Sequence, residues 1–380
     1  MAENDAASIV LENGTALKLW KSYAINSNFL TPTDGWDFTF GTEVEWKRVK
    51  DMIAPDSKIQ ILIDGVLQLT GWIDSYHVEA SAEGGTSITV HGRDVMKPLV
   101  KSNVYPGMAI KGKTIADIIT SVLAEVYPYN TPLLYTDPEA NRLLIADPSK
   151  KYRKASNSKA NSKRKSKAHN VLEYYEAHPQ EGAFEFISRM LRKSGMWLWP
   201  TADGNFVVGG PDYEQPSMYV IHRTNGDSLA QVTRSSYTFD KTSVPSYIHV
   251  AGKGASKDFA KVPVNGLAQD PSHKLYCPIY IKHDEATTNE EAQNFADQEM
   301  SRLKQNERVY ECTVRGHRNV LSNAFYQPNT IATVVDEILG IDEELWILDR
   351  TFRKSVDAGT TTDLKMIPKN AIQLADCDAP

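Results

Sequence analysis

The alternation of hydrophobic and polar positions is repeated in two stretches of the chain, residues 59–90 and residues 331–366. Each stretch opens with a β-branched run that ends in an aspartate, continues to a Trp-Ile pair with an aspartate close behind, and crosses a Gly-Thr turn into a last strand. The spacings between these features differ by only one or two residues. A pattern that recurs once near each end of a chain predicts two copies of one β module. Chance similarity between two amphipathic hairpins is the alternative.

Aligning the two stretches makes a demanding prediction about register. The alignment places Trp72 at the position of Trp346 and Ile73 at that of Ile347, with a one-residue β-bulge at Leu348. We expect both tryptophans to be core residues. A slip of one residue would turn every side chain of a strand to the opposite face, so agreement in register would be strong support for duplication.

The pattern of residues 1–98 predicts an all-β module. Asn-Gly at residues 13–14 and Asp-Gly at residues 64–65 are strong hairpin signals. The strand after the second turn is expected to place Trp72 and Tyr76 together on its inner face. Strands this short and numerous favour a small barrel or sandwich.

The middle of the chain, residues 99–216, is predicted to mix helices and strands. Residues 114–126 carry isoleucine and valine at helical spacing, and Thr114 with Asp117 resembles a capping box at the start of this helix. A second amphipathic helix is predicted over residues 182–194, and a short hairpin follows it.

Residues 217–380 return to β structure and contain the second copy of the repeated pattern. A helix rich in Glu, Gln and Ala is predicted at residues 289–306, inserted before the last strands. The sequence therefore predicts an α+β protein that is mainly β, with two β-barrel modules, 1–98 and 217–380, and a mixed α/β middle domain, 99–216.

Composition and charge refine this picture. A chain of 380 residues is longer than one hydrophobic core usually supports, so two to four domains are expected. The net charge is −6, but residues 150–168 hold nine Lys or Arg and no acid, which leaves 33 basic and 48 acidic residues elsewhere, a balance of −15. A mostly acidic body does not present the basic face of a duplex-binding domain.

The basic stretch 150–168 is low in complexity and is predicted to be a mobile loop, because it has almost no apolar side chain to bury. It could contact nucleic acid, a partner protein or the host envelope, or it could be a solvated tether. Its one aromatic residue, Tyr152, gives no stacking platform for bases. The candidate contact residues are Lys150, Lys151, Arg153, Lys154, Lys159, Lys163, Arg164, Lys165 and Lys167.

No residue pattern indicates catalysis or a bound cofactor. The three cysteines, Cys277, Cys312 and Cys377, are far apart and odd in number, so reduced thiols are expected. Metal-ligand spacing such as CxxC or HExxH is absent, and the acids at residues 342–344 are expected to form a solvated turn rather than hydrolase carboxylates. Neither a transmembrane helix nor a signal peptide is predicted. We therefore expect no enzyme, no metal and no cofactor.

Several short motifs, taken in order, resemble one protein family. They are IDG, GWID and GRD within residues 63–94, then EGAFEFISRMLRKSGMWLWPTADGNFVVGGP at residues 181–211, then VRGH at 314–317 with QPNT at 327–330. Together they resemble the central baseplate hub proteins of Mu-like contractile phage tails, the late-control type. This family is related to the hub region of secretion-system spike proteins.

The resemblance implies a structural protein of the virion baseplate, made in the cytoplasm of the bacterial host. Such hubs are homotrimers with two tail-tube-like β modules per chain. They join the tail tube protein and other tail proteins above to a trimeric spike below, among surrounding baseplate proteins. Because nothing resembling a spike follows within the 380 residues, the resemblance implies a separate spike protein. DNA is expected to pass through a central channel without sequence-specific binding.

Symmetry gives the same expectation from the duplication itself. Two similar modules per chain in a trimer place six similar modules around one axis, so the ring has pseudo-sixfold symmetry. Such a ring can bind a hexameric tube on one side, and its true threefold symmetry can bind a trimeric spike on the other. The alternatives are a peptidoglycan-degrading tail enzyme and a hub-like component of a non-contractile tail or a secretion machine.

Overall fold

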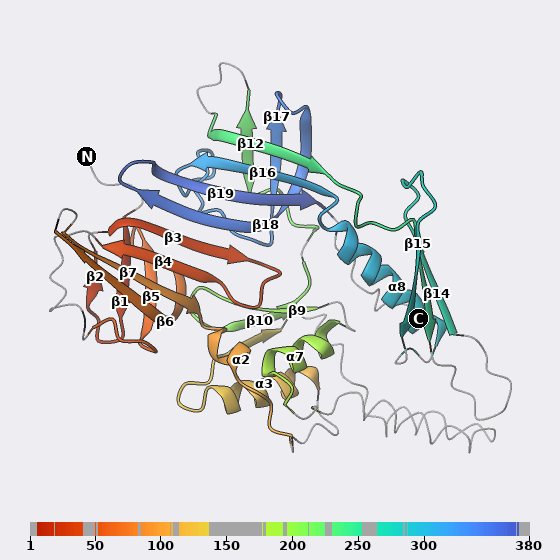
Figure 1. Ribbon diagram of the computed structural model, residues 1–380, viewed down its shortest axis with the longest axis horizontal. Coiled ribbons are helices and arrows are strands. Elements are labelled where there is room, and N and C mark those ends of the chain that lie inside the picture. Colours follow the sequence, from red (N-terminus) through yellow and green to blue (C-terminus); the bar gives the residue numbers. More distant parts are fainter. Residues whose placement is uncertain are drawn as a thin grey trace. The chain divides into compact units, whose positions relative to one another are not determined.

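The computed structural model of the chain (Figure 1) is described for residues 6–18, 20–40, 50, 52–82, 85–106, 108, 114–136, 177, 180–192, 196–211, 213–224, 230–252, 264–283, 286, 288–369 and 371. These residues fall into two compact units, 1–211 with 352–360 and 212–351 with 361–380. Strands outnumber helices in both units, which confirms the predicted class, α+β and mainly β. The division into domains at residues 98 and 216 stays a prediction.

The first unit is built on six antiparallel strands in the order β3-β4-β7-β6-β5-β1 (Figure 1), with β2 (Ala16–Leu17) added beside β1. Alternation sets the buried face, as Ile59, Ile61 and Ile63 are each at most 1% exposed while Lys58 and Gln60 point away. The strands are β1 (Ala7–Leu11), β3 (Trp20–Asn28), β4 (Gly35–Phe40), β5 (Lys58–Ile63), β6 (Val66–Ser81) and β7 (Gly85–Asp94).

The second unit contains six strands in the order β12-β16-β19-β18-β17-β11. This is the order of the first sheet, strand for strand, and the strands also follow one another along the chain in the same sequence. One pairing differs, because β11 runs parallel to β17 whereas β1 runs antiparallel to β5. The strands are β11 (Tyr219–Arg223), β12 (Val232–Phe239), β16 (Arg308–Arg315), β17 (Thr330–Asp336), β18 (Ile341–Ser355) and β19 (Gly359–Pro368).

The last strands of the two sheets agree in register as well as in order. Each begins at a glycine with positive φ, 68° at Gly85 and 72° at Gly359, a backbone conformation that favours glycine. In both strands the third, fifth and seventh positions after the glycine are buried: Ile88, Val90 and Gly92 in β7, and Thr362, Leu364 and Met366 in β19. The repeated pattern in the sequence is therefore a repeated structure.

The tryptophans agree in their place on the strand but not in their burial. Trp72 pairs with Lys58 and Trp346 pairs with Ile331, and in each case the following isoleucine, Ile73 or Ile347, is fully buried. Trp346 is itself 0% exposed, as expected. The prediction that Trp72 is a core residue is wrong, because it is only half-buried.

The prediction that Trp72 and Tyr76 share a face of the sheet is also wrong, and the pairing of β6 with β7 gives the reason. Trp72 is opposite Arg93, whereas Tyr76 is opposite Val90, because β6 has a bulge between Ile73 and Ser75. The bulge adds one residue to β6 and so places the two rings on opposite faces. Tyr76 remains 39% exposed. The bulge predicted at Leu348 of β18 stays a prediction.

The end of the β18–β19 hairpin, Phe352–Thr360, groups with the first unit. There the Val356 N–H donates to the Lys21 carbonyl of β3 at 3.1 Å. The boundary between the compact units therefore does not coincide with a single point along the chain.

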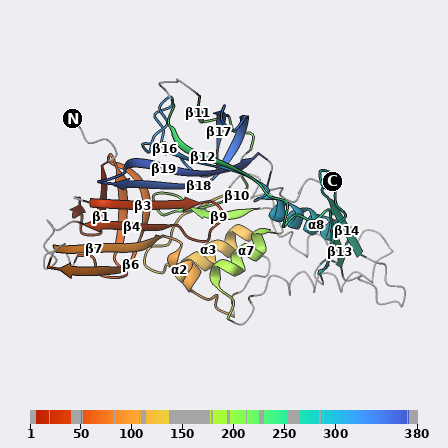
Figure 2. The same ribbon diagram turned by 45° about the horizontal axis from the view of Figure 1, so that its top comes forward.

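The middle of the chain forms a second hydrophobic core within the first unit, and its helices lie close together in Figure 2. Helix α3 (Ile115–Val126) begins at the predicted capping box, where the Asp117 N–H donates to the Thr114 hydroxyl and the Thr114 N–H donates to the Asp117 carboxylate. It packs with α2 (Lys97–Lys101) and α7 (Ala183–Arg192), and a three-stranded sheet completes the layer. Its strands are β8 (Leu134–Thr136), β9 (Trp197–Pro200) and β10 (Phe206–Gly209).

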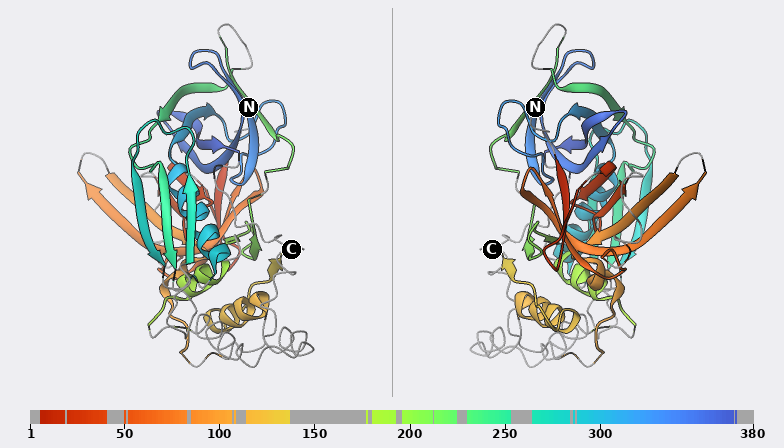
Figure 3. Two further views of the ribbon diagram at one scale, coloured as in Figure 1. Left: turned by 90° about the vertical axis from the view of Figure 1, so that its right-hand side faces the viewer. Right: turned by 90° about the vertical axis from the view of Figure 1, so that its left-hand side faces the viewer.

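The second unit carries an insert between β12 and β16. Helix α8 (Asn289–Lys304) lies along one face of a sheet of the order β14-β13-β15 (Figure 3), and this helix confirms the predicted one at 289–306. Helix and sheet share a separate hydrophobic core, in which Gly266 allows β14 to approach the backbone of Ala292. The strands are β13 (Tyr247–Gly252), β14 (Val264–Gln269) and β15 (Pro278–His283).

Candidate interaction surfaces

The face of each repeated sheet opposite its core carries a matching pair of an acidic and a basic residue. In the first sheet Asp37 of β4 stands opposite His91 of β7. In the second sheet Glu311 of β16 stands opposite Lys365 of β19. His91 and Lys365 are each the sixth residue after the turn glycine, so an acid and a base occupy equivalent cross-strand positions.

The neighbouring cross-strand pairs on these faces are also polar. The Thr39 and Thr89 hydroxyls lie 3.2 Å apart in the first sheet, and the Thr313 hydroxyl donates to the Asp363 carboxylate at 2.8 Å in the second. Burial raises the pKa of Asp37, and the charges of His91 and Arg353 oppose this shift. Each repeated sheet therefore has an apolar core face and a polar face of mixed charge.

A hollow of about 370 Å³ opens on the polar face of the second sheet. Three carboxylates, Asp349, Asp363 and Glu311, lie in its lining together with Arg234 and Lys365, so the site has no single strong charge. The remaining lining residues are Ser236, Cys312, Thr313 and Leu364.

Among the described residues that line this hollow, Cys312 is the one thiol, and it is buried. Burial raises the pKa of the Cys312 thiol well above its usual range, and the charges of Asp336 and Asp363 act in the same direction. The thiolate is the nucleophilic form of cysteine, so this side chain is unsuited to covalent catalysis at neutral pH. Cys277 is also free, and Cys377 lies outside the described residues.

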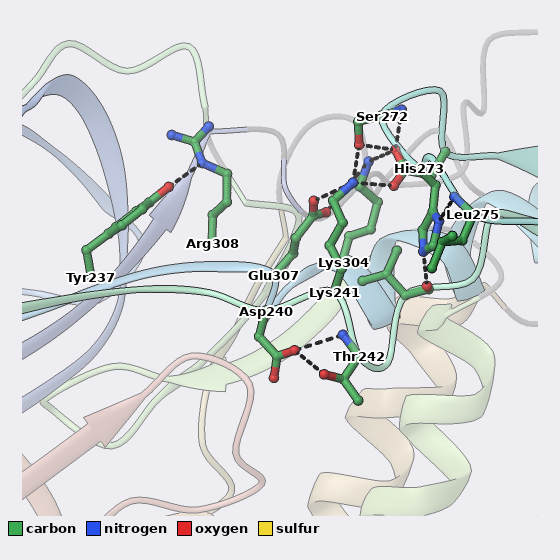
Figure 4. Close-up of polar contacts among 12 residues, drawn as sticks. Tyr237, Asp240, Lys241, Thr242, Ser272, His273, Leu275, Lys304, Glu307 and Arg308 are labelled. Carbon is green, nitrogen blue, oxygen red and sulfur yellow. Dashed lines mark hydrogen bonds and ion pairs between the residues drawn. The ribbon is translucent and has the colours of Figure 1, made fainter. Parts of the chain in front are cut away.

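An ionic cluster joins the insert to the second sheet (Figure 4). The Asp270 carboxylate, fully buried at the end of β14, accepts hydrogen bonds from Lys241 and Lys304, each at 3.1 Å, and from the Ser272 hydroxyl at 2.7 Å. Lys241 also pairs with Glu307 at 3.3 Å. Burial alone would raise the pKa of Asp270, but the hydrogen bonds from Ser272, Lys241 and Lys304 outweigh it and hold the pKa well below its usual range.

The positions of these residues explain what the cluster does. Lys241 lies where the chain leaves β12 for the insert, and Lys304 and Glu307 lie where it returns to β16. The Asp240 N–H also donates to the Glu307 carbonyl at 2.8 Å, which ties the two crossings together. One buried carboxylate of the insert is therefore bonded to both chain segments that connect it to the sheet.

The residues singled out from the sequence are distributed as follows. All nine basic candidates of the stretch 150–168 lie outside the described residues, so their contact role stays a prediction.

The acids at 342–344 are expected in a turn, but they lie at the start of β18. There Glu343 pairs with Arg308 at 2.7 Å and Glu344 pairs with Lys369 at 2.6 Å. The turn lies just before them, at residues 337–340, because Asp336 pairs with Ile341 and closes it.

No local sequence motif predicts the polar clusters that bring distant residues together. Asp270 is 29 residues from Lys241 and 34 from Lys304, and no local motif links them. Over the part of the chain that is described, no three His, Cys, Asp or Glu side chains are arranged to hold a metal ion. No helix among the same residues is long and apolar enough to cross a bilayer.

A family model matches the first β module. Residues 8–94 match the model described as Mu phage baseplate assembly protein GpP-like, N-terminal. This match confirms the resemblance to Mu-type baseplate proteins in that part of the chain. A search of curated proteins gives no match.

Solved structures resemble the whole chain. The tail protein from Neisseria meningitidis MC58 is 21% identical with a TM-score of 0.76, over 97% of this chain and 98% of that one. The 43 kDa tail protein of prophage MuSo2 from Shewanella oneidensis is 18% identical with a TM-score of 0.76, over 97% and 100%. The E. coli c3393 protein, a type VI secretion system component, is 10% identical with a TM-score of 0.53, over 95% and 76%. The chain therefore has the fold of phage tail proteins.

Proposed function

We propose that this chain is the central hub of a phage tail baseplate, a structural protein that assembles as a homotrimeric ring. The observation that carries the proposal is the strand-for-strand repetition of the two sheets, in a chain whose first module matches a Mu-type baseplate family. Three copies of such a chain supply six similar modules around one axis. Closed cyclic symmetry makes such a ring self-limiting.

The two symmetries of this ring explain how it joins different partners. A hexameric tail tube would contact the features that both modules share, since the two sheets have the same strand order. A separate trimeric spike would contact features that occur once per chain. The hub would thus connect a sixfold-symmetric tube to a threefold-symmetric spike. It would do so within the virion, surrounded by the other baseplate proteins.

The polar faces of the modules suit the wall of a channel for DNA. The second face places three carboxylates beside two basic groups, and the chain outside the basic stretch has a balance of −15. Phosphates bind tightly where basic side chains release counterions from DNA. A wall with a small excess of acid repels phosphate, so DNA can slide through without sequence-specific binding.

The role of the basic stretch 150–168 belongs to the same proposal. If it is a solvated tether, replacement by a Gly/Ser linker leaves folding and trimer formation intact. If it contacts DNA, the affinity of the intact chain for DNA falls steeply as salt is raised, and the replacement removes this binding.

The experiment that tests the proposal is a mass measurement in solution. Light scattering coupled to size exclusion should give three times the 42.4 kDa of the chain. A monomer that persists at micromolar concentration, with no rings in electron micrographs, would contradict the proposal. No cofactor and no catalytic step are part of it.

A second candidate is the hub region of a secretion machine, because a type VI secretion component shares this fold over 95% of the chain. The two candidates differ in the particle that contains the protein. Tail particles released by lysis of the host should contain the chain if it is a phage hub. Its retention in a cell-envelope complex would favour the secretion machine.

A further inference from the structure

The hairpin tips of the two repeated modules differ, although they lie at equivalent ends. In the first module the pair Ile63 and Val66 closes a tip of two residues between β5 and β6. In the second module the pair Asp336 and Ile341 closes a tip of four residues, 337–340, between β17 and β18. The strand order is the same in both sheets, so the longer tip is a feature that occurs once per chain.

The longer tip displays two apolar side chains. Ile338 is 56% exposed and Leu339 is 37% exposed. Acidic residues flank them, since Glu337 and Asp342 are exposed on either side. Two adjacent aliphatic side chains in solvent, with carboxylates around them, are the complement of an apolar socket with a basic rim.

A buried carboxylate holds this tip in one conformation. Asp336 is 0% exposed, and it accepts hydrogen bonds from the Ile338 and Leu339 N–H groups, each at 3.1 Å. Its other oxygen accepts from the Ser235 hydroxyl at 2.5 Å and the Tyr310 hydroxyl at 3.0 Å. A loop fixed in this way loses little conformational entropy on binding, so its exposed side chains are preorganised for a partner.

We propose that the 337–340 tip binds a separate threefold-symmetric tail protein, through an apolar socket with a basic rim that receives Ile338 and Leu339. This inference rests on the proposed function, because it uses the ring of six modules. A hexameric partner makes one contact six times and so needs features that both modules share. The four-residue tip is present in three of the six modules, which is the pattern that a trimeric partner requires.

The first test uses purified tail particles assembled with variant hubs. Replacing both aliphatic side chains, Ile338→Ser with Leu339→Ser, should lower the amount of the trimeric partner per hub by about tenfold or more, as removal of central apolar anchors does. The amounts of tube protein and of hub trimer should not change. Val66→Ser is the matched control, because Val66 is 45% exposed at the tip of the first module, and it should leave the particle unchanged.

Three results overturn the inference while the hub proposal stands. They are normal partner content in the double variant, an equal loss of tube protein, and an equal loss caused by Val66→Ser. A wild-type hub that forms no trimer contradicts the hub proposal itself, so the two failures are distinguishable.

The second test identifies what the tip contacts. A benzoylphenylalanine photocrosslinker at position 338, in the same purified particles, should form an adduct with a trimeric tail protein, identified by mass spectrometry. An adduct with the tube protein, an adduct with another hub copy, or no adduct in assembled particles would overturn the inference.

Discussion

At the scale of single residues, burial decides which members of the repeated pattern stabilise the fold. Trp346 is fully buried, its ring lies 5.7 Å from that of Tyr213, and its indole N–H donates to the Asn329 side-chain oxygen at 3.1 Å. Trp72 occupies the equivalent strand but is only half-buried. Tryptophan at this position therefore contributes unequally to the stability of the two modules.

This inequality predicts different costs for the two truncations. Trp346→Ala should lower the free energy of unfolding by about 3–5 kcal/mol, because it leaves a large cavity and removes the indole N–H that donates to the Asn329 side-chain oxygen. Trp72→Ala is the matched comparison and should cost about 1–2 kcal/mol, a typical value for a partly buried site. Chemical denaturation of both variants measures the difference, and equal costs would show that the assigned burial is wrong.

Asp94 makes the stability of the first module depend on pH. Its buried carboxyl accepts from the Thr33 hydroxyl at 2.6 Å and from the Asp34 and Met96 N–H groups, each at 3.0 Å. Burial and the nearby Asp34 charge raise the pKa of Asp94 to about 7. The folded state then binds a proton more tightly than the unfolded state, so this carboxyl lowers stability as pH rises from about 4 towards 7.

Asp94→Asn should remove this dependence. The wild-type protein should unfold at a lower temperature at pH 8 than at pH 5, and the variant should show a smaller difference. Asp357→Asn removes an exposed carboxyl and should behave like the wild type. A variant with an unchanged pH profile would mean that Asp94 is ionised throughout this range.

At the scale of elements, local signals were sufficient where the structure is local. The capping box at Thr114 and the turn glycines Gly85 and Gly359 depend on residues a few positions apart, and they lie where the sequence predicts them. The side of the sheet on which each side chain of β6 lies was harder to predict, because the bulge after Ile73 reverses the alternation of that strand. The parallel pairing of β11 also leaves no periodic signal in so short a strand.

The insert is the element whose anchoring could not be predicted from the sequence. Asp270 contacts Lys241 and Lys304 only after β12, β14 and α8 have folded together. Asp270→Asn should therefore destabilise the second unit by about 2 kcal/mol, because hydrogen bonds between charged groups are lost around a buried site. Hydrogen exchange should become faster at residues 240–244 and 304–308, where the insert joins the sheet.

Glu299→Gln is the control for this prediction. It removes an ion pair on α8 between Glu299 and Arg302, whose side chain is 60% exposed. Such surface ion pairs contribute little to the free energy of unfolding. Equal exchange rates in the Asp270→Asn variant and the wild type would show that the cluster does not hold the insert.

At the scale of the whole molecule, duplication links the fold to the proposed assembly. The two sheets share strand order, the register of their last strands and the acid–base pair on their polar faces. They differ in the length of one hairpin tip and in the direction of one strand. Features that both modules share suit a sixfold partner, and features that occur once per chain suit a threefold one. The proposed hub requires both kinds of feature in one ring.

Electron microscopy of the purified chain tests this requirement most directly. We expect threefold rings in which the two modules of each chain are related by about one-sixth of a turn, with their polar faces together lining a central channel. The pairs Asp37–His91 and Glu311–Lys365 should then lie at the same height in the wall. Rings without pseudo-sixfold symmetry, or modules whose polar faces point away from the axis, would contradict the proposed hub.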